Sequence, residues 1–177
     1  MNMLLNRNDI NPNTANQLGQ TPVFVAAYKG REGVVKMLLE RVDVNPNTAN
    51  KYGQAPLHVA ARKGHEGVVK MLLDRNDINL NTVNQHGQTP LFLAARERHE
   101  RAVKQLLERA NVNSDMIDLT SQTALSYALK GGHDPIVKLL SEHRNSIPSL
   151  NGDRFTALSS PKLSDPNQHP SKRIRRF

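Results

Sequence analysis

The sequence predicts an all-α fold, a solenoid of helix–turn–helix units joined by hairpin-like loops. One motif recurs at an interval of 34 residues, beginning at Gly19, Gly53, Gly87 and, in a weaker form, Ser121. An interval of this size is typical of stacked repeat proteins, in which each unit buries a face against its neighbours and does not fold alone. Aromatic residues make up only 4% of the chain and tryptophan is absent, so the core must consist mainly of aliphatic side chains. Such side chains suit thin layers of packed helices.

The repeat divides the 177 residues into units. Residues 1–16 correspond to the second helix and the loop of an incomplete preceding unit, because Met3–Thr14 copies Met37–Thr48. Four units follow, at residues 17–50, 51–84, 85–118 and 119–148. Residues 149–177 are rich in serine and proline and carry half of the formal net charge of +8. We expect this basic tail to be disordered, with the vestige of a fifth unit at Thr156-Ala157-Leu158.

Each unit begins with a short helix whose ends are marked by capping residues. In the first unit Thr21 is placed to cap the helix through its hydroxyl, and Pro22 occupies the first turn, where no backbone N–H is required. The pair Ala26-Ala27 is small enough to let neighbouring helices approach closely, and Gly30 is the expected end of the helix. Three units depart from this pattern, through Ala55 for threonine, Arg98 for glycine and Ala124 for proline.

A second helix and a long loop complete each unit. In the first unit the second helix is expected at residues 33–39, where Val35, Leu38 and Leu39 form one apolar stripe and Lys36 lies outside it. The same stripe recurs in every unit. Residues 42–53 are dense in asparagine, proline and glycine, which specify turns. We interpret this segment as an extended finger that joins successive helix pairs.

These units resemble the ankyrin repeat. The segment Gly53–Leu73 follows the family pattern Gly-x-Thr-Pro-Leu-His-x-Ala-Ala-x-x-Gly-His and Val-Val-x-x-Leu-Leu almost throughout, and the resemblance covers about residues 1–148. It implies a right-handed stack of helix pairs with projecting fingers and a concave face that grips other proteins. The near identity of the first three complete units is also similar to recently duplicated arrays in fungal and microbial proteins.

The resemblance also indicates which residues would meet a partner. In the family, the two residues after the alanine pair line the concave groove, and the finger tips add further contacts. We therefore predict a partner-binding surface formed by Tyr28, Lys29, Tyr52, Arg62, Lys63, His86, Arg96 and Lys130. A basic groove with tyrosines as anchors would suit an acidic segment of a partner protein. The alternative is that these lysines and arginines are solvated surface residues without a binding role.

No residues in the sequence support a catalytic, cofactor or metal site. Cysteine is absent, and neither a Gly-x-Ser-x-Gly turn nor a phosphate-binding loop occurs. His65, His99 and His133 share one repeat position, so we expect them about 10 Å apart in a stack, too far to share a metal ion. We expect these histidines and His58 to form structural hydrogen bonds. The chain is accordingly predicted to have no enzymatic activity, cofactor or metal.

The leading hypothesis is a non-catalytic protein-interaction module, a scaffold or adaptor that acts as a monomer. The alternative is a regulatory C-terminal portion of a larger signalling protein or enzyme. No apolar run is long enough to span a membrane, and nucleic-acid binding is not expected, because the basic tail lacks interleaved aromatic residues. We expect an intracellular, cytoplasmic protein. A short import signal that would direct it to the nucleus is the alternative to a merely solubilising tail, at Lys172, Arg173, Arg175 and Arg176.

Overall fold

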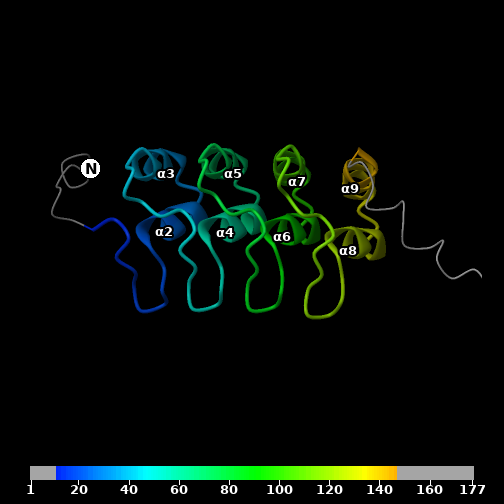
Figure 1. The fold of residues 1–177 in the computed structure, drawn as a ribbon, viewed down its shortest axis with the longest axis horizontal. Helices are drawn as coiled ribbons and strands as arrows, with labels where there is room; N and C mark the ends of the chain where they lie inside the picture. The colour runs from blue at the N-terminus through cyan, green and yellow to red at the C-terminus, as the bar shows by residue number, and fades with distance from the viewer. Residues whose placement is uncertain (1–10, 147–177) are drawn as a thin grey trace, which may run out of the picture. The chain divides into compact units, whose positions relative to one another are not determined.

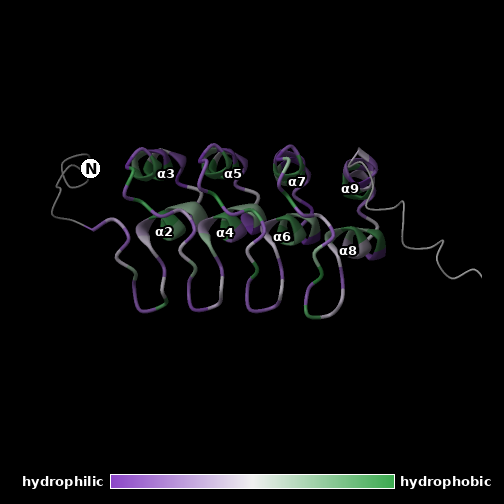
Figure 2. Ribbon diagram, in the orientation of Figure 1, coloured by the Kyte–Doolittle hydropathy of each residue, from purple (hydrophilic) through white to green (hydrophobic). Residues whose placement is uncertain are grey.

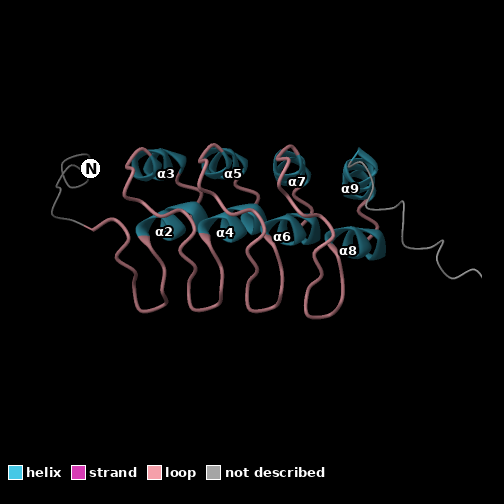
Figure 3. Ribbon diagram, in the orientation of Figure 1, coloured by secondary structure: helices cyan, strands magenta, loops and turns pink. Residues whose placement is uncertain are grey.

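The computed structural model describes residues 11–146, which form a stack of four helix pairs (Figure 1). The first helices of the pairs are α2 (Pro22–Tyr28), α4 (Pro56–Lys63), α6 (Pro90–Arg96) and α8 (Ala124–Lys130). The second helices are α3 (Glu32–Leu39), α5 (Glu66–Leu73), α7 (Glu100–Leu107) and α9 (Asp134–Ser146). No strand is present in this part of the chain (Figure 3). The prediction of an all-α solenoid of helix–turn–helix units is confirmed.

The helices form two rows along the stack. The first helices contact one another in sequence, and so do the second helices, while each first helix also packs on the second helix of its own unit (Figure 1). The loops between units extend from the row of first helices, on the side away from the second helices. We call these loops fingers, and they comprise residues 11–20, 41–54, 75–88 and 109–122.

Each helix pair lies inside one of the four predicted units. The residues at which one unit ends and the next begins remain predictions. Several expectations concern residues outside the described range: the short helix before residue 11, the vestige of a fifth unit, the basic tail and the import signal at residues 172–176.

The first helices begin at side chains that accept a hydrogen bond from the helix backbone. Thr21 Oγ1 accepts from the N–H of Phe24 at 3.4 Å, and Thr89 and Thr123 cap α6 and α8 in the same way. At Ala55 no hydroxyl is available, so the N–H of His58 donates to the carbonyl oxygen of Ala55 at 3.0 Å, and the Nδ1 of the His58 ring accepts from the Ala55 N–H at 3.1 Å. The expected caps at Thr21 and Thr89 are confirmed, and α4 has no hydroxyl cap.

The first helices end in left-handed backbone conformations. Gly64 has a φ of +67°, and a Cβ at this position would lie 2.4 Å from the Nδ1 of His99. Both the conformation and the space therefore require glycine here. At the equivalent position of the third unit, Arg98 adopts a φ of +64°. Its Nε donates to the Nε2 of His133 at 2.6 Å and its Nη2 donates to the carbonyl oxygen of Gly131 at 3.0 Å.

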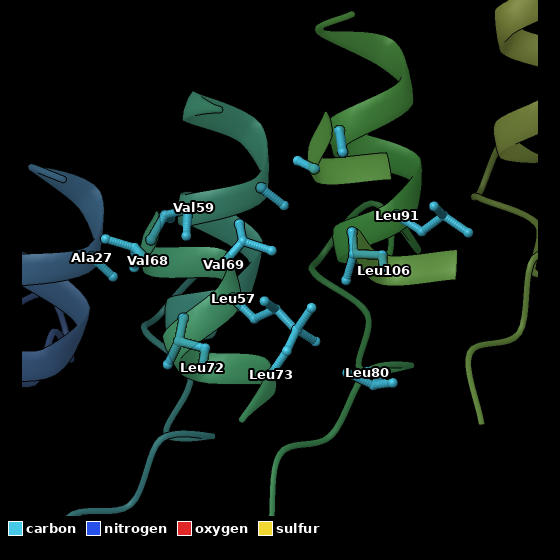
Figure 4. Packing of buried hydrophobic residues seen from close by; sticks show 14 of the residues in the cluster. Ala27, Leu57, Val59, Val68, Val69, Leu72, Leu73, Leu80, Leu91 and Leu106 are labelled. Atoms are coloured by element: carbon cyan, nitrogen blue, oxygen red, sulfur yellow. The ribbon is translucent and has the colours of Figure 1, made fainter. Parts of the chain in front are cut away.

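A continuous hydrophobic core runs between the two rows of helices. The alanines after the first helical turns are buried, and Leu57, Val69 and Leu72 are fully excluded from solvent. Figure 4 shows these side chains meeting between α4 and α5. Hydrophobic residues concentrate on the helices and hydrophilic residues on the fingers (Figure 2). Since burial of apolar surface is the main stabilising term, neighbouring units stabilise one another.

Arginines at one repeat position donate hydrogen bonds to backbone carbonyl groups at the ends of second helices. The Arg75 guanidinium donates to the carbonyl oxygen of Leu39 at 3.0 Å, which belongs to the preceding unit. It also makes two hydrogen bonds of 2.8 and 2.9 Å with the Asp77 carboxylate, and these hold the pKa of Asp77 below its ordinary value. Arg109 donates in the same way to the carbonyl oxygen of Leu73. A cation at this place also complements the negative end of the helix dipole.

Asparagines at another repeat position join consecutive fingers. The Nδ2 of Asn47 donates to the carbonyl oxygen of Asp77 at 2.7 Å, and its Oδ1 accepts from the N–H of Asn79 at 2.8 Å. Asn13 and Asn81 form equivalent pairs of hydrogen bonds with the units that follow them. This asparagine ladder fixes the spacing between the bases of the fingers.

Replacing Asn47 with alanine should lower the free energy of unfolding by about 1–2 kcal/mol, because two backbone groups lose their partners. Urea denaturation of the purified chain measures this change. Asn76→Ala is the matched control, since Asn76 is exposed in the next finger, the one that Asn47 contacts, and its side chain makes no hydrogen bond with residues 11–146. Equal losses in the two variants would contradict a role for the asparagine ladder.

Candidate functional site

The finger tips are held by an asparagine or aspartate side chain at the start of each turn. The Oδ1 of Asn50 accepts from the N–H groups of Tyr52 and Gln54 at 2.9 and 3.0 Å. Asn16, Asn84 and Asp118 form the same pair of bonds in the other fingers. Desolvation tends to raise the pKa of Asp118, but hydrogen bonds from Thr120 and Gln122 outweigh it, so the pKa is lowered. The local turn therefore sets the direction of each tip.

Hydrogen bonds also connect neighbouring finger tips. The N–H of Lys51 donates to the carbonyl oxygen of Leu18, the N–H of Gln85 to that of Tyr52 and the N–H of Leu119 to that of His86, each at 3.0 Å. The four tips thus form one row in a fixed register. A surface of this kind loses little conformational entropy when a ligand binds to it.

A polar hollow lies between the fingers and the first helices of the second and third units. It has a volume of about 390 Å³. Tyr52 and His86 enter it from two finger tips, and Arg62 of α4 and Arg96 of α6 enter it from the ends of the first helices. We call this the middle hollow, and its complete lining is Tyr52, Gln54, Arg62, Asn84, Gln85, His86, Gln88, Leu93 and Arg96. Four of the eight predicted partner-binding residues therefore lie around one hollow.

The two arginines of the middle hollow differ in their partners. The Arg96 guanidinium forms an ion pair with Glu97 at 2.8 Å, and its Nη1 donates to the Oε1 of Gln88 at 3.2 Å. The Arg62 guanidinium makes no hydrogen bond or ion pair with any residue between 11 and 146. Arg62 is thus available to an anionic ligand, whereas the charge of Arg96 is partly balanced.

The other four predicted residues lie outside the lining of the middle hollow. The Nζ of Lys63 lies over the ring of Tyr28, 5.2 Å from its centroid, in a cation–π contact between two neighbouring units. Lys29 lines a mainly apolar hollow of about 440 Å³ beside α2 and α3. Lys130 lines a hollow of about 380 Å³ together with Arg96 and Tyr127. The predicted residues thus form a centre at the middle hollow and two flanks, one with Tyr28, Lys29 and Lys63 and the other with Lys130.

Five residues that line the middle hollow are absent from the predicted set, namely Gln54, Asn84, Gln85, Gln88 and Leu93. Among them, Leu93 lies buried at the base of the hollow, and Gln88 accepts a hydrogen bond from Arg96. A signal for Leu93 exists in the sequence, because the equivalent residues of the first two units are the smaller Val25 and Val59. The partnership of Gln88 with Arg96 depends on side-chain conformation, and no sequence pattern indicates it.

The histidines at the start of the second helices have the structural role that the sequence predicts. The Nε2 of His65 lies 3.2 Å from the carbonyl oxygen of Tyr28, and that of His99 lies 3.0 Å from the carbonyl oxygen of Arg62. His133 makes the corresponding contact through Nδ1, with the carbonyl oxygen of Ala95 at 3.1 Å. Two of these rings fix the helix ends that carry Tyr28 and Arg62. The described residues contain no group of three or more histidines and carboxylates placed to hold a metal ion.

The second unit contains one further buried histidine, His58, in α4. Burial lowers the pKa of His58 to about 4, and its Nε2 faces the backbone of Thr82 and Gln88 without forming a well-aligned hydrogen bond. The neutral ring accepts the hydrogen bond of the Ala55 N–H. His58 is therefore a structural residue of α4.

Comparison with known proteins identifies the repeat. Between residues 11 and 146 no helix has both the length and the apolar character needed to cross a membrane. No curated protein matches the chain. A family model described as ankyrin repeats (3 copies) matches residues 1–84 and again residues 76–151. Ankyrin repeats are generally protein–protein interaction modules. Because these matches span most of the 177 residues, the chain belongs to the ankyrin-repeat family.

Proposed function

We propose that this chain is a non-catalytic module that binds another protein through its finger tips and the basic surface beside them. The observation that carries the proposal is the meeting of Tyr52, Arg62, His86 and Arg96 around the middle hollow. Hydrogen bonds fix the finger tips in one register and also anchor the helix end at Arg62. Preorganised side chains of this kind lose little entropy on docking, which favours binding.

The charge of this surface suggests an acidic segment in the partner. The lining of the middle hollow contains two arginines and no carboxylate, and Lys63 and Lys130 add positive charge on the two flanks. Positive potential in a groove attracts acidic segments and speeds their association. We further propose that the chain acts as a monomeric adaptor in the cytoplasm. The alternative of a regulatory portion of a larger signalling protein finds no specific support in residues 11–146.

Replacing Arg62, Lys63 and Arg96 together with glutamate should abolish capture of the partner. The substitutions reverse three charges on the binding surface, so an acidic segment would meet repulsion instead of attraction. Affinity capture from a lysate, with quantification of the bound proteins by mass spectrometry, measures the effect.

The matched control is Lys36→Glu, Lys70→Glu and Lys104→Glu, made together. These lysines are exposed at one repeat position of the second helices, so the change in net charge is the same but lies away from the fingers. We expect the control to retain the partner. Equal capture of the partner by both triple variants would refute the proposed surface. Equal loss of capture would show that the effect comes from the change in net charge and not from the position of the substitutions.

A further inference from the structure

We propose that the middle hollow is a pocket for one carboxylate side chain, an aspartate or glutamate of an extended segment in the partner. The inference rests on the proposed function, because it assigns one contact within that binding surface. Its basis is the unpaired Arg62 guanidinium, together with the balance of charge around it.

The balance of charge suits a single negative charge. Arg62 and Arg96 together contribute two positive charges, and Glu97 balances one of them through its 2.8 Å ion pair with Arg96. Among the residues that line the hollow, one positive charge remains, on the guanidinium that has no partner within residues 11–146. A carboxylate neutralises that charge completely. A phosphate group carries nearly two negative charges and would leave an excess of negative charge in the hollow.

The available hydrogen-bond donors also suit a carboxylate. A guanidinium presents paired N–H groups that match the two oxygens of a carboxylate, and such paired bonds are stronger than neutral ones. Arg96 already donates to Glu97 and Gln88, so Arg62 is the main donor to an incoming group. The side-chain amides of Gln54 and Gln85 line the same hollow, and although the Nε2 of Gln85 lies 3.2 Å from the Nε2 of His86, each amide nitrogen carries two N–H donors.

The remaining walls fit the methylene groups of an acidic side chain. Tyr52, 47% exposed, stands at the edge of the hollow and offers its ring, whereas Leu93 lines the hollow but is only 1% exposed and adds little accessible apolar surface. The ring shields one side of the ion pair from water, which strengthens the pair.

The arrangement occurs once in the described stack. The repeat position of Arg62 and Arg96 is held by Tyr28 in the first unit and by Lys130 in the fourth. Only the second and third units therefore place two guanidinium groups side by side. Lys63 lies over one face of the Tyr28 ring, so this end of the surface presents an aromatic ring and a cation together. A partner segment that crosses the fingers would be fixed in register by its acidic residue at the middle hollow.

Binding of short peptides to the full chain tests the pocket. The probes are fluorescein-labelled octaglutamate, octaglutamine and an eight-residue peptide of alternating phosphoserine and glycine, whose total charge is close to that of octaglutamate. Fluorescence anisotropy measures their affinities for the unaltered chain, for Arg62→Gln and for Lys36→Gln, an exposed residue on a second helix. Circular dichroism verifies that the variants remain folded.

We expect octaglutamate to bind, octaglutamine not to bind, and Arg62→Gln to weaken octaglutamate at least ten-fold, against less than two-fold for Lys36→Gln. The Nε resonance of Arg62 should shift on addition of octaglutamate. Equal weakening by the two variants, or no binding of octaglutamate, would overturn the pocket. Tighter binding of the phosphoserine peptide would overturn its assignment to a carboxylate. None of these results would refute the proposed function, which fails only if capture of the partner is insensitive to the triple substitution in the groove.

Discussion

Replacing Leu72 with alanine should lower the free energy of unfolding by about 3 kcal/mol. Leu72 lies in α5, is fully buried and belongs to the continuous core (Figure 4). The substitution removes apolar contacts and leaves a cavity that closely packed helices fill only in part. Since α5 contacts both α3 and α7, the loss also weakens the coupling of the second unit to its two neighbours. Urea denaturation followed by circular dichroism measures the effect.

The control for Leu72→Ala is Lys70→Ala in the same helix. Lys70 is exposed, and alanine favours helix at least as well as lysine, so this variant should stay within about 0.5 kcal/mol of the original chain. The two substitutions thus separate core packing from helix propensity. A cost below about 1 kcal/mol for Leu72→Ala would contradict the view that burial between units holds the stack together.

The stack should lose about 3 kcal/mol of stability between pH 7 and pH 4 through His58 alone. Burial lowers the pKa of His58 from 6.5 to about 4, so in this interval the unfolded chain binds a proton that the folded chain does not. The stabilisation is therefore fully present above pH 6.5 and is lost as the pH falls toward 4. Protonation would also place a donor on the Nδ1 that accepts from the Ala55 N–H. Denaturation curves measured at several pH values report the loss.

The variant His58→Phe separates this effect from the titration of other groups. Phe24 and Phe92 occupy the same position in the first and third units and are buried there, so the substitution preserves an aromatic core residue. We expect a smaller loss of stability between pH 7 and pH 4 in the variant, by about 3 kcal/mol. Parallel pH profiles for the two proteins would show that His58 does not titrate as its burial requires.

The sequence was sufficient to predict the elements of the fold, because the repeat places equivalent residues in equivalent surroundings. Thr21 caps its helix, and Gly64 ends another in the left-handed conformation. Only α9 differs clearly, since it continues to Ser146, beyond the apolar pattern that ends near Leu140. The residues after that pattern include a partly buried His143, which periodicity alone does not indicate.

Contacts between units were harder to predict, because they depend on the conformations of long side chains. The placement of Lys63 over Tyr28 and the ion pair of Arg96 with Glu97 cannot be read from a repeat pattern. The asparagine ladder has a clear 34-residue spacing, yet the sequence indicates only that asparagines favour turns. Which basic residues remain unpaired, Arg62 above all, follows only from the three-dimensional arrangement.

Site-specific photo-crosslinking tests the proposed binding surface most directly. A benzophenone amino acid would replace Tyr52 at a finger tip in one variant and exposed Lys70 on a second helix in the other. After irradiation in cells, we predict a covalent adduct with another protein from position 52 and none above background from position 70. An adduct from position 70 alone would contradict the account, because it would place the partner on the second helices and away from the fingers.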